Sequence, residues 1–276
     1  MKKVIFTIIL PIYMLVPYLS TAQITIAPTN MFIEGNNRFG TYMVINNSNE
    51  PQEVGIDFTF SYAQTNTDGN RKTVTEDSVV SAQYSLPQYV RAFPKNFILQ
   101  PNQRQVVRIR LNLPSDLPDG TYWSRIVTSA TPQSPPVEIG SSDAVTAQVG
   151  ITIRQITGLF YKKGSVSTGI EVERIRTQSN DGILTVLTDF QRTGNSPFLG
   201  SIFVSIFDQA GSLIKEDFVS TSLYFDGTHR QRLDVSDLPT GEYNIQVKFE
   251  SRRTDIPRSD LIQIQPEIFS TTVNLP

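Results

Sequence analysis

The chain has 276 residues, which favours two domains at about 150 residues each. Hydrophobic residues make up 39% and charged residues 18% of the chain, which is enough apolar content for packed cores. The formal net charge of -2 argues against nucleic-acid binding. The absence of cysteine excludes disulfides, thiol nucleophiles and cysteine-bound metals, and the single histidine, His229, excludes a multi-histidine metal site. We therefore expect no cofactor, no metal site and no catalytic residues.

The first residues have the layout of an export signal. Lys2 and Lys3 precede an apolar run from Val4 to Leu19, and small residues end at Ala22. A membrane anchor is the alternative, but the run is shorter than the ~20 residues of a spanning helix and contains two prolines. The sequence predicts a cleaved signal peptide over 1–22 and export to the periplasm, with the cell surface as a further possible location.

The rest of the chain has the period-2 alternation of β-strands. β-Branched and aromatic residues alternate with polar ones between turns rich in Gly, Pro, Asn and Asp. No segment has an apolar stripe with helical period. We therefore expect an all-β protein with two immunoglobulin-like β-sandwich domains in tandem, over 23–161 and 165–276, separated by the polar break at 162–165.

One motif occurs twice. Asp116–Tyr122 reads Asp-Leu-Pro-Asp-Gly-Thr-Tyr, and Asp237–Tyr243 reads Asp-Leu-Pro-Thr-Gly-Glu-Tyr. Proline fixes φ, glycine permits a positive φ and tyrosine begins the next strand. Each copy predicts a tyrosine corner, in which the tyrosine hydroxyl bonds back to the corner backbone.

Several polar features have less specific interpretations. Segments 65–77 and 131–143 are expected to be exposed loops. His229 is expected to be a surface residue in a turn. Four arginines of the first domain are expected to cluster, namely Arg104, Arg108, Arg110 and Arg125. Arg108 and Arg110 should share one face of a strand. That face either binds an acidic partner or is an ordinary polar face.

Four segments of the first domain resemble the PapD-like periplasmic chaperones of chaperone–usher systems. The most specific is Val90–Ile109, which is similar to the family's Pro-x-x-Phe-x-Leu-x-Pro-x-x-x-Gln-x-x-Arg segment. The others are Ile24–Gly35, Gly120–Ile126 and Val149–Lys162. The resemblance spans roughly residues 24–162, whereas the second domain matches the family only weakly.

The resemblance implies two basic residues between the domains that hold the C-terminal carboxylate of a pilus subunit. The corresponding positions here are Asn30 and Gly158, and neither is basic. Arg154, Lys162 and Lys163 are nearby in sequence and are candidates to replace the missing cations.

The resemblance also implies that one strand is lent to complete a subunit's sheet. Val145, Ala147, Val149 and Ile151 alternate as such a strand requires, and the half from Val145 to Val149 is the favoured donor part. The favoured interpretation is nevertheless that these side chains face the protein's own core, as in any sandwich strand.

Together these features predict a non-catalytic, exported, chaperone-like protein that binds surface or fimbrial subunits by β-strand addition. A structural or adhesion component of a cell-surface assembly, of the pilus, secretion or gliding type, is the alternative. An enzyme such as a carboxylate-dependent glycosidase is a third class.

Overall fold

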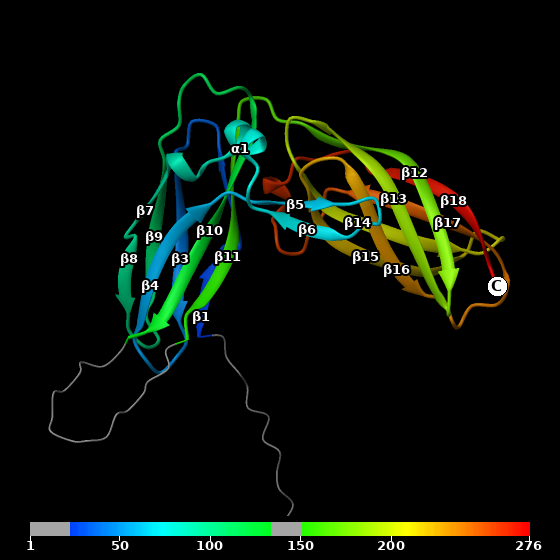
Figure 1. Cartoon of the computed structure of the whole chain (residues 1–276), viewed down its shortest axis with the longest axis horizontal. Coiled ribbons are helices and arrows are strands. Elements are labelled where there is room, and N and C mark those ends of the chain that lie inside the picture. Colours follow the sequence, from blue (N-terminus) through cyan, green and yellow to red (C-terminus); the bar gives the residue numbers. More distant parts are fainter. Residues whose placement is uncertain (1–22, 134–150) are drawn as a thin grey trace, which may run out of the picture.

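The computed structural model describes residues 23–133 and 151–276, and these form two β-sandwiches beside one another (Figure 1). The signal peptide predicted over 1–22 lies outside the described residues. No helix in these two ranges is long and apolar enough to cross a membrane. The expectation of an all-β, two-sandwich fold is confirmed.

The first sandwich consists of a four-stranded and a five-stranded sheet. In sheet order, the four-stranded sheet contains β1 (Ile24–Ala27), β3 (Phe39–Asn46), β9 (Arg104–Leu111) and β7 (Val90–Phe93). The five-stranded sheet contains β2 (Asn30–Glu34), β11 (Ile153–Lys163), β10 (Gly120–Pro132), β4 (Gln52–Thr59) and β8 (Asn96–Leu99). All their pairings are antiparallel except β2 with β11, which is parallel.

Alternation places the first core between these sheets. On β9, Val107, Ile109 and Leu111 are buried, whereas Arg108 and Arg110 are exposed on the opposite face, as the sequence pattern predicts. The burial of these apolar side chains removes their surface from water. It stabilises the fold by about 25 cal/mol for each Å² buried, which is the main stabilising contribution.

The second sandwich follows a turn at Gly164, whose φ is +60°. Its three-stranded sheet contains β12 (Thr168–Asn180), β13 (Ile183–Gly194) and β16 (Gly227–Asp234). Its four-stranded sheet contains β15 (Leu213–Leu223), β14 (Phe198–Phe207), β17 (Gly241–Glu250) and β18 (Glu267–Leu275). β11 thus continues two residues past the expected domain end at 161.

Both tyrosine corners are confirmed. The Tyr122 hydroxyl donates to the carbonyl oxygen of Pro118 at 2.8 Å, and the Tyr243 hydroxyl donates to that of Pro239 at 2.9 Å. Both tyrosines are buried, so each bond ties a corner to the core of its own sandwich.

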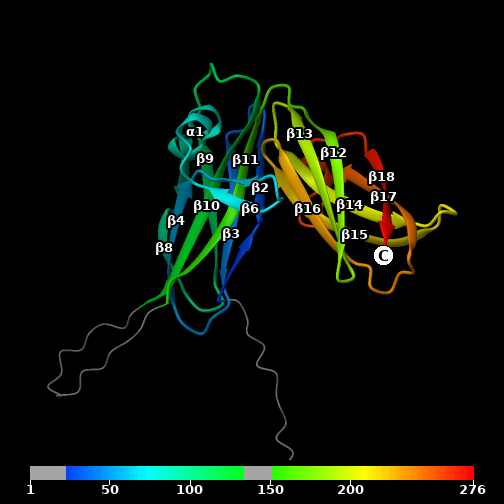
Figure 2. The ribbon, with the colours of Figure 1, turned by 45° about the vertical axis from the view of Figure 1, so that its right-hand side comes forward.

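The polar segment 65–77 is not simply a loop, which corrects the expectation. It forms most of a β-hairpin, β5 (Tyr62–Thr65) and β6 (Arg71–Val74), that extends from the first sandwich to the second (Figures 1 and 2). A short helix follows, α1 (Ser78–Tyr84), whose N-cap Asp77 accepts a hydrogen bond from the Val80 amide. Two 3₁₀ turns, η1 (Pro87–Tyr89) and η2 (Arg258–Asp260), complete the helical content of the described residues.

Two other expectations were wrong. His229 lies within β16 rather than in a turn, because the strand begins at Gly227 and pairs His229 with Thr188 of β13. Arg125 does not join Arg108 and Arg110: it lies on β10, in the other sheet, and its guanidinium donates to the Tyr224 hydroxyl of the second domain. Alternation identifies a strand's faces but not the sheet to which the strand belongs.

Candidate partner-binding edge and interdomain cleft

Strand β11 has one edge that is open over half of its length. Residues 153–157 pair with β10 on one side, and among the described residues no strand pairs with them on the other side. From Gly158 onward, β2 occupies that second side in parallel register. The open edge therefore presents unpaired strand backbone, which is what a partner strand needs for β-addition.

Two exposed isoleucines lie in and directly before this open edge. Ile156 is 66% exposed, and Ile151, directly before β11, is 68% exposed. Arg154 is exposed on the same face of β11 as Ile156. The other face carries half-buried Ile153 and then buried Thr157 toward the first core. Val145, Ala147 and Val149 lie outside the described residues, so the choice between a donor strand and a core strand stays open for them.

Asn30 and Gly158 lie directly opposite one another in the β2–β11 pair. The structure thus brings together the two positions at which the resemblance implies basic residues. A Cβ atom at position 158 would lie 2.6 Å from Asn30 Oδ1 and 2.8 Å from Phe160 Cε2. These distances leave no space for a side chain at 158, so a basic residue there would require its neighbours to move.

Two carboxylates, Asp255 and Asp260, line the cleft next to Asn30. The Asn30 amide donates to Asp255 Oδ2 at 3.2 Å, across the boundary between the domains. Arg253 donates to both oxygens of Asp255, and this contact lowers the pKa of the Asp255 carboxyl below its usual value. The cleft, of about 490 Å³, also contains Phe32 and Asp260 in its walls. Because Asp255 is paired with Arg253 and accepts the Asn30 amide, neither Asn30 nor Arg253 is free to bind a partner carboxylate in this arrangement.

Lys162 and Arg154 do not replace the missing cations. Lys162 is buried, pairs with Glu34 and donates to the carbonyl oxygen of Asp260 at 2.7 Å, so its charge is already satisfied. Arg154 is four residues before Gly158, about 13 Å along an extended strand, in the half of β11 that β2 does not pair with. The structure therefore leaves Asn30, Arg154 and Lys162 without a common site.

An aromatic cluster joins the two domains. Trp123, the only tryptophan, is 1% exposed, and its ring lies 5.0 Å from that of Tyr84 and 4.8 Å from that of Tyr224. Phe60 and Phe225 contact the same indole from the first and second domains, respectively. Such ring pairs contribute about 0.5–1.5 kcal/mol each beyond their buried area. The cluster holds the two sandwiches together behind the cleft.

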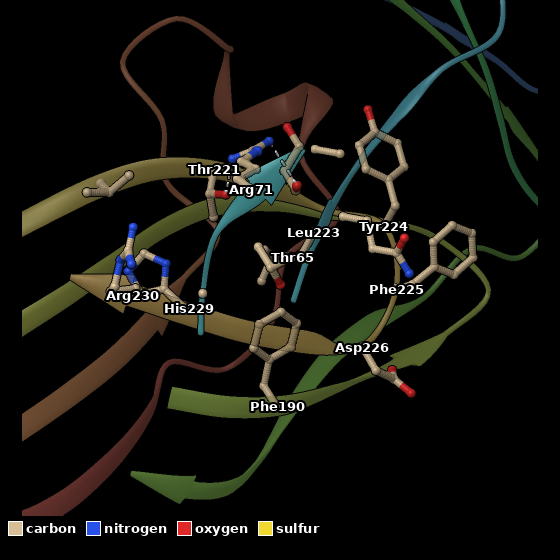
Figure 3. Close-up of a pocket in the computed structure, with 15 residues that line it drawn as sticks. Thr65, Arg71, Phe190, Thr221, Leu223, Tyr224, Phe225, Asp226, His229 and Arg230 are labelled. Atoms are coloured by element: carbon tan, nitrogen blue, oxygen red, sulfur yellow. Dashed lines mark hydrogen bonds between the residues drawn. The ribbon is translucent and has the colours of Figure 1, made fainter. Parts of the chain in front are cut away.

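The β5–β6 hairpin makes a second connection. Arg71 donates to Thr221 Oγ1 at 2.9 Å, and the Thr228 amide donates to Thr65 Oγ1 at 3.0 Å. The hairpin and the second domain enclose a pocket of about 160 Å³, which Arg71 and Thr65 enter from one side and His229 from the other (Figure 3). Burial lowers the pKa of the His229 imidazole, and its Nε2 lies 3.0 Å from Gln231 Oε1.

The sequence interpretation missed the second-domain residues at the cleft. Arg253, Asp255 and Asp260 follow β17 in a segment without alternation, so they gave no periodic signal. The described residues contain no group of three His, Asp or Glu side chains arranged to hold a metal ion.

The family model for the secretion system C-terminal sorting domain matches residues 182–256. In the structure this range runs from the start of β13 past the end of β17, within the second sandwich. No curated protein matches the sequence.

Several solved structures of pilus chaperones are distantly similar. A chaperone–tip adhesin complex of CFA/I fimbriae aligns over 90% of this chain and 98% of its own, with 12% identity and a TM-score of 0.47. The CsuC–CsuE chaperone–tip subunit complex of Acinetobacter baumannii Csu pili covers the same shares, with 13% identity and a TM-score of 0.44. The YadV chaperone aligns over 92% of this chain and all of its own, with 12% identity and a TM-score of 0.43. At these values the likeness assigns neither a partner nor an activity.

Proposed function

We propose that this protein is a non-catalytic, chaperone-like binding protein that acts after export, in the periplasm, and captures a β-rich protein subunit by strand addition to β11. The open backbone edge at 153–157, flanked by exposed Ile151 and Ile156, carries this proposal. The first sandwich, over 23–161, is the binding domain, and the second, over 165–276, supports it through the aromatic cluster.

The mode of capture differs from the one that the family resemblance implies. Asn30 is engaged by Asp255, and position 158 has no space for a side chain, so affinity comes from backbone pairing and apolar contacts rather than from a carboxylate clamp. Apolar contacts are not screened by ions, so binding should change little with salt.

A photo-crosslinking experiment tests the edge. The chain has no cysteine, so Ile156→Cys creates a single site for a thiol-reactive benzophenone. Irradiation in the exported fraction of producing cells should give one dominant adduct with a β-rich protein. Arg232→Cys, exposed on β16 of the second domain, is the matched control and should give none. Equal adducts at both positions, or none at Ile156, would contradict strand addition at this edge.

The match to a sorting domain favours a second candidate, in which the protein is a component of a cell-surface assembly. Fractionation separates the two. A chaperone should be recovered from the periplasm in a 1:1 complex with its subunit, whereas a structural component should be digested by protease added to intact cells and should sediment with a large assembly.

A further inference from the structure

One face of the first sandwich combines arginine with exposed aromatic residues. It is the outer face of the sheet β1-β3-β9-β7, and we call it the arginine face. Strand register places its side chains in four rows. The rows are Arg91–Arg110–Phe39, Phe93–Arg108–Thr41, Val106–Met43–Ala27 and Arg104–Ile45–Thr25.

The charges of this face are not compensated. Its four arginines are exposed, and none forms an ion pair with a carboxylate of the described residues. No outward position of the four strands carries Asp or Glu. The excess of positive charge is local, because the chain as a whole has a formal charge of -2.

Two of the arginines lie directly opposite one another. Arg91 of β7 pairs with Arg110 of β9. Like charges at directly opposed positions destabilise a sheet, so this arrangement does not serve the stability of the free protein. In the free protein the Arg91 guanidinium donates to the carbonyl oxygens of Gln88 and Val90, and the Arg110 guanidinium lies beside the Phe39 ring, so neither charge is neutralised by a carboxylate.

The apolar part of the face is also exposed. Phe39 is 57%, Phe93 56% and Val106 49% exposed, and the Arg110 guanidinium lies 5.9 Å from the centre of the Phe39 ring. Aromatic residues, methionine and arginine are enriched in the centres of protein–protein interfaces, whereas lysine, aspartate and glutamate are depleted there. The arginine face has this composition, with Met43 opposite Val106 and no lysine.

We propose that the arginine face is a docking surface for an acidic protein, separate from the strand-addition edge of β11. The planar guanidinium matches a carboxylate in a two-bond geometry, and Phe39 and Phe93 supply the apolar contact area. Opposite charge on the partner speeds association and selects against basic surfaces. A chaperone with both sites can hold its subunit at one and contact an assembly component at the other.

Binding to a random copolymer of glutamate and tyrosine tests this site, because that probe carries both carboxylates and rings. The full chain should bind the copolymer and not poly-L-lysine, and binding should weaken with added salt. Arg108→Glu with Arg110→Glu should lower the affinity by at least about tenfold, because attraction becomes repulsion. Arg232→Glu with Arg258→Glu, exposed in the second domain, changes net charge equally and should retain the affinity of the unaltered protein.

The reversed variant should remain folded, because Arg91 then faces a glutamate instead of Arg110. Its melting temperature is measured beside the binding assay, and Arg108→Gln with Arg110→Gln provides a milder second variant. Unchanged copolymer affinity in both folded variants would overturn the proposal. Binding to phosphatidylglycerol vesicles that exceeds copolymer binding and depends on the same arginines would also overturn it, in favour of a lipid surface. Ile156→Cys crosslinking is independent of these changes, so failure here leaves the strand-addition test intact.

Discussion

Tyr122 and Tyr243 occupy equivalent corners of the two sandwiches: each hydroxyl donates to the carbonyl oxygen of the proline four residues earlier. The two domains thus share one local motif, in which a hydrogen bond connects a turn to the strand that follows it. β10 and β17, the strands that begin at these corners, are each flanked by two hydrogen-bonded partners.

Loss of either corner bond should destabilise the protein. Tyr122→Phe and Tyr243→Phe should each lower the free energy of unfolding by about 0.5–1.5 kcal/mol, the net contribution of one hydrogen bond. Urea unfolding followed by circular dichroism measures the change. Tyr89→Phe is the control, because no hydrogen bond of its hydroxyl is present among the described contacts, and its midpoint should not move. Corner variants that unfold at the wild-type midpoint would count against the role of these bonds.

Position 158 should not accept a side chain. Gly158→Ala places a Cβ against Asn30 and the Phe160 ring, and overpacking of this kind costs about 1–3 kcal/mol. Thermal melting of Gly158→Ala alone and combined with Asn30→Gly separates the two clashes. The double variant should recover only part of the loss, because the contact with Phe160 remains. Full stability in the single variant would show that the strand pair can relax, and a basic residue could then be accommodated there.

The aromatic cluster should govern the fluorescence of the single tryptophan. Tyr224→Ala removes a ring 4.8 Å from Trp123 and the acceptor of the Arg125 guanidinium. Water should reach the indole, so the emission maximum should move to longer wavelength, and stability should fall by about 3 kcal/mol. Phe39→Ala removes an exposed ring that is not among the rings in contact with Trp123, and it should leave the emission unchanged. An unchanged spectrum for Tyr224→Ala would argue that the remaining aromatic rings are enough to exclude water from the indole.

Asp189 should make stability depend on acid pH. Its carboxylate pairs with Arg176 and Arg174 and accepts a hydrogen bond from Thr228, and the Arg176 contact contributes most to lowering its pKa to about 2. Because the pKa is lower in the folded state, the stabilisation is complete above about pH 4 and is lost as pH falls toward about 2.

The Asp189 carboxylate stabilises the folded state by about 2 kcal/mol at neutral pH, since one unit of pKa difference corresponds to about 1.36 kcal/mol. Asp189→Asn should therefore unfold at lower urea than wild type at pH 7 and at a similar concentration at pH 2. Asp57→Asn is the control: Asp57 pairs with Lys95 at the surface, where both side chains are more than half exposed, and a surface pair contributes little. A constant difference between Asp189→Asn and wild type from pH 7 to pH 2 would contradict the assigned titration.

The sequence alone was sufficient for features that depend on local backbone geometry and on burial. Alternation along β9 identified the buried face of Val107, Ile109 and Leu111, because every second side chain of a strand points to the same side. The repeated Pro-x-Gly-x-Tyr turn identified both corners, because each forms within five residues of chain.

Only the tertiary structure decided which strands lie side by side. Asn30 and Gly158 meet through a parallel pairing between distant segments, and Asp255 reaches Asn30 from the other domain. Alternation states which face of a strand is buried but not which strand is its neighbour, because the neighbour is chosen by the packing of the whole chain. For the same reason the polar segment at 65–77 gave no sign that, as a hairpin, it would contact the second domain. Neither the cleft beside Asn30 nor the four rows of the arginine face could be assembled from the sequence.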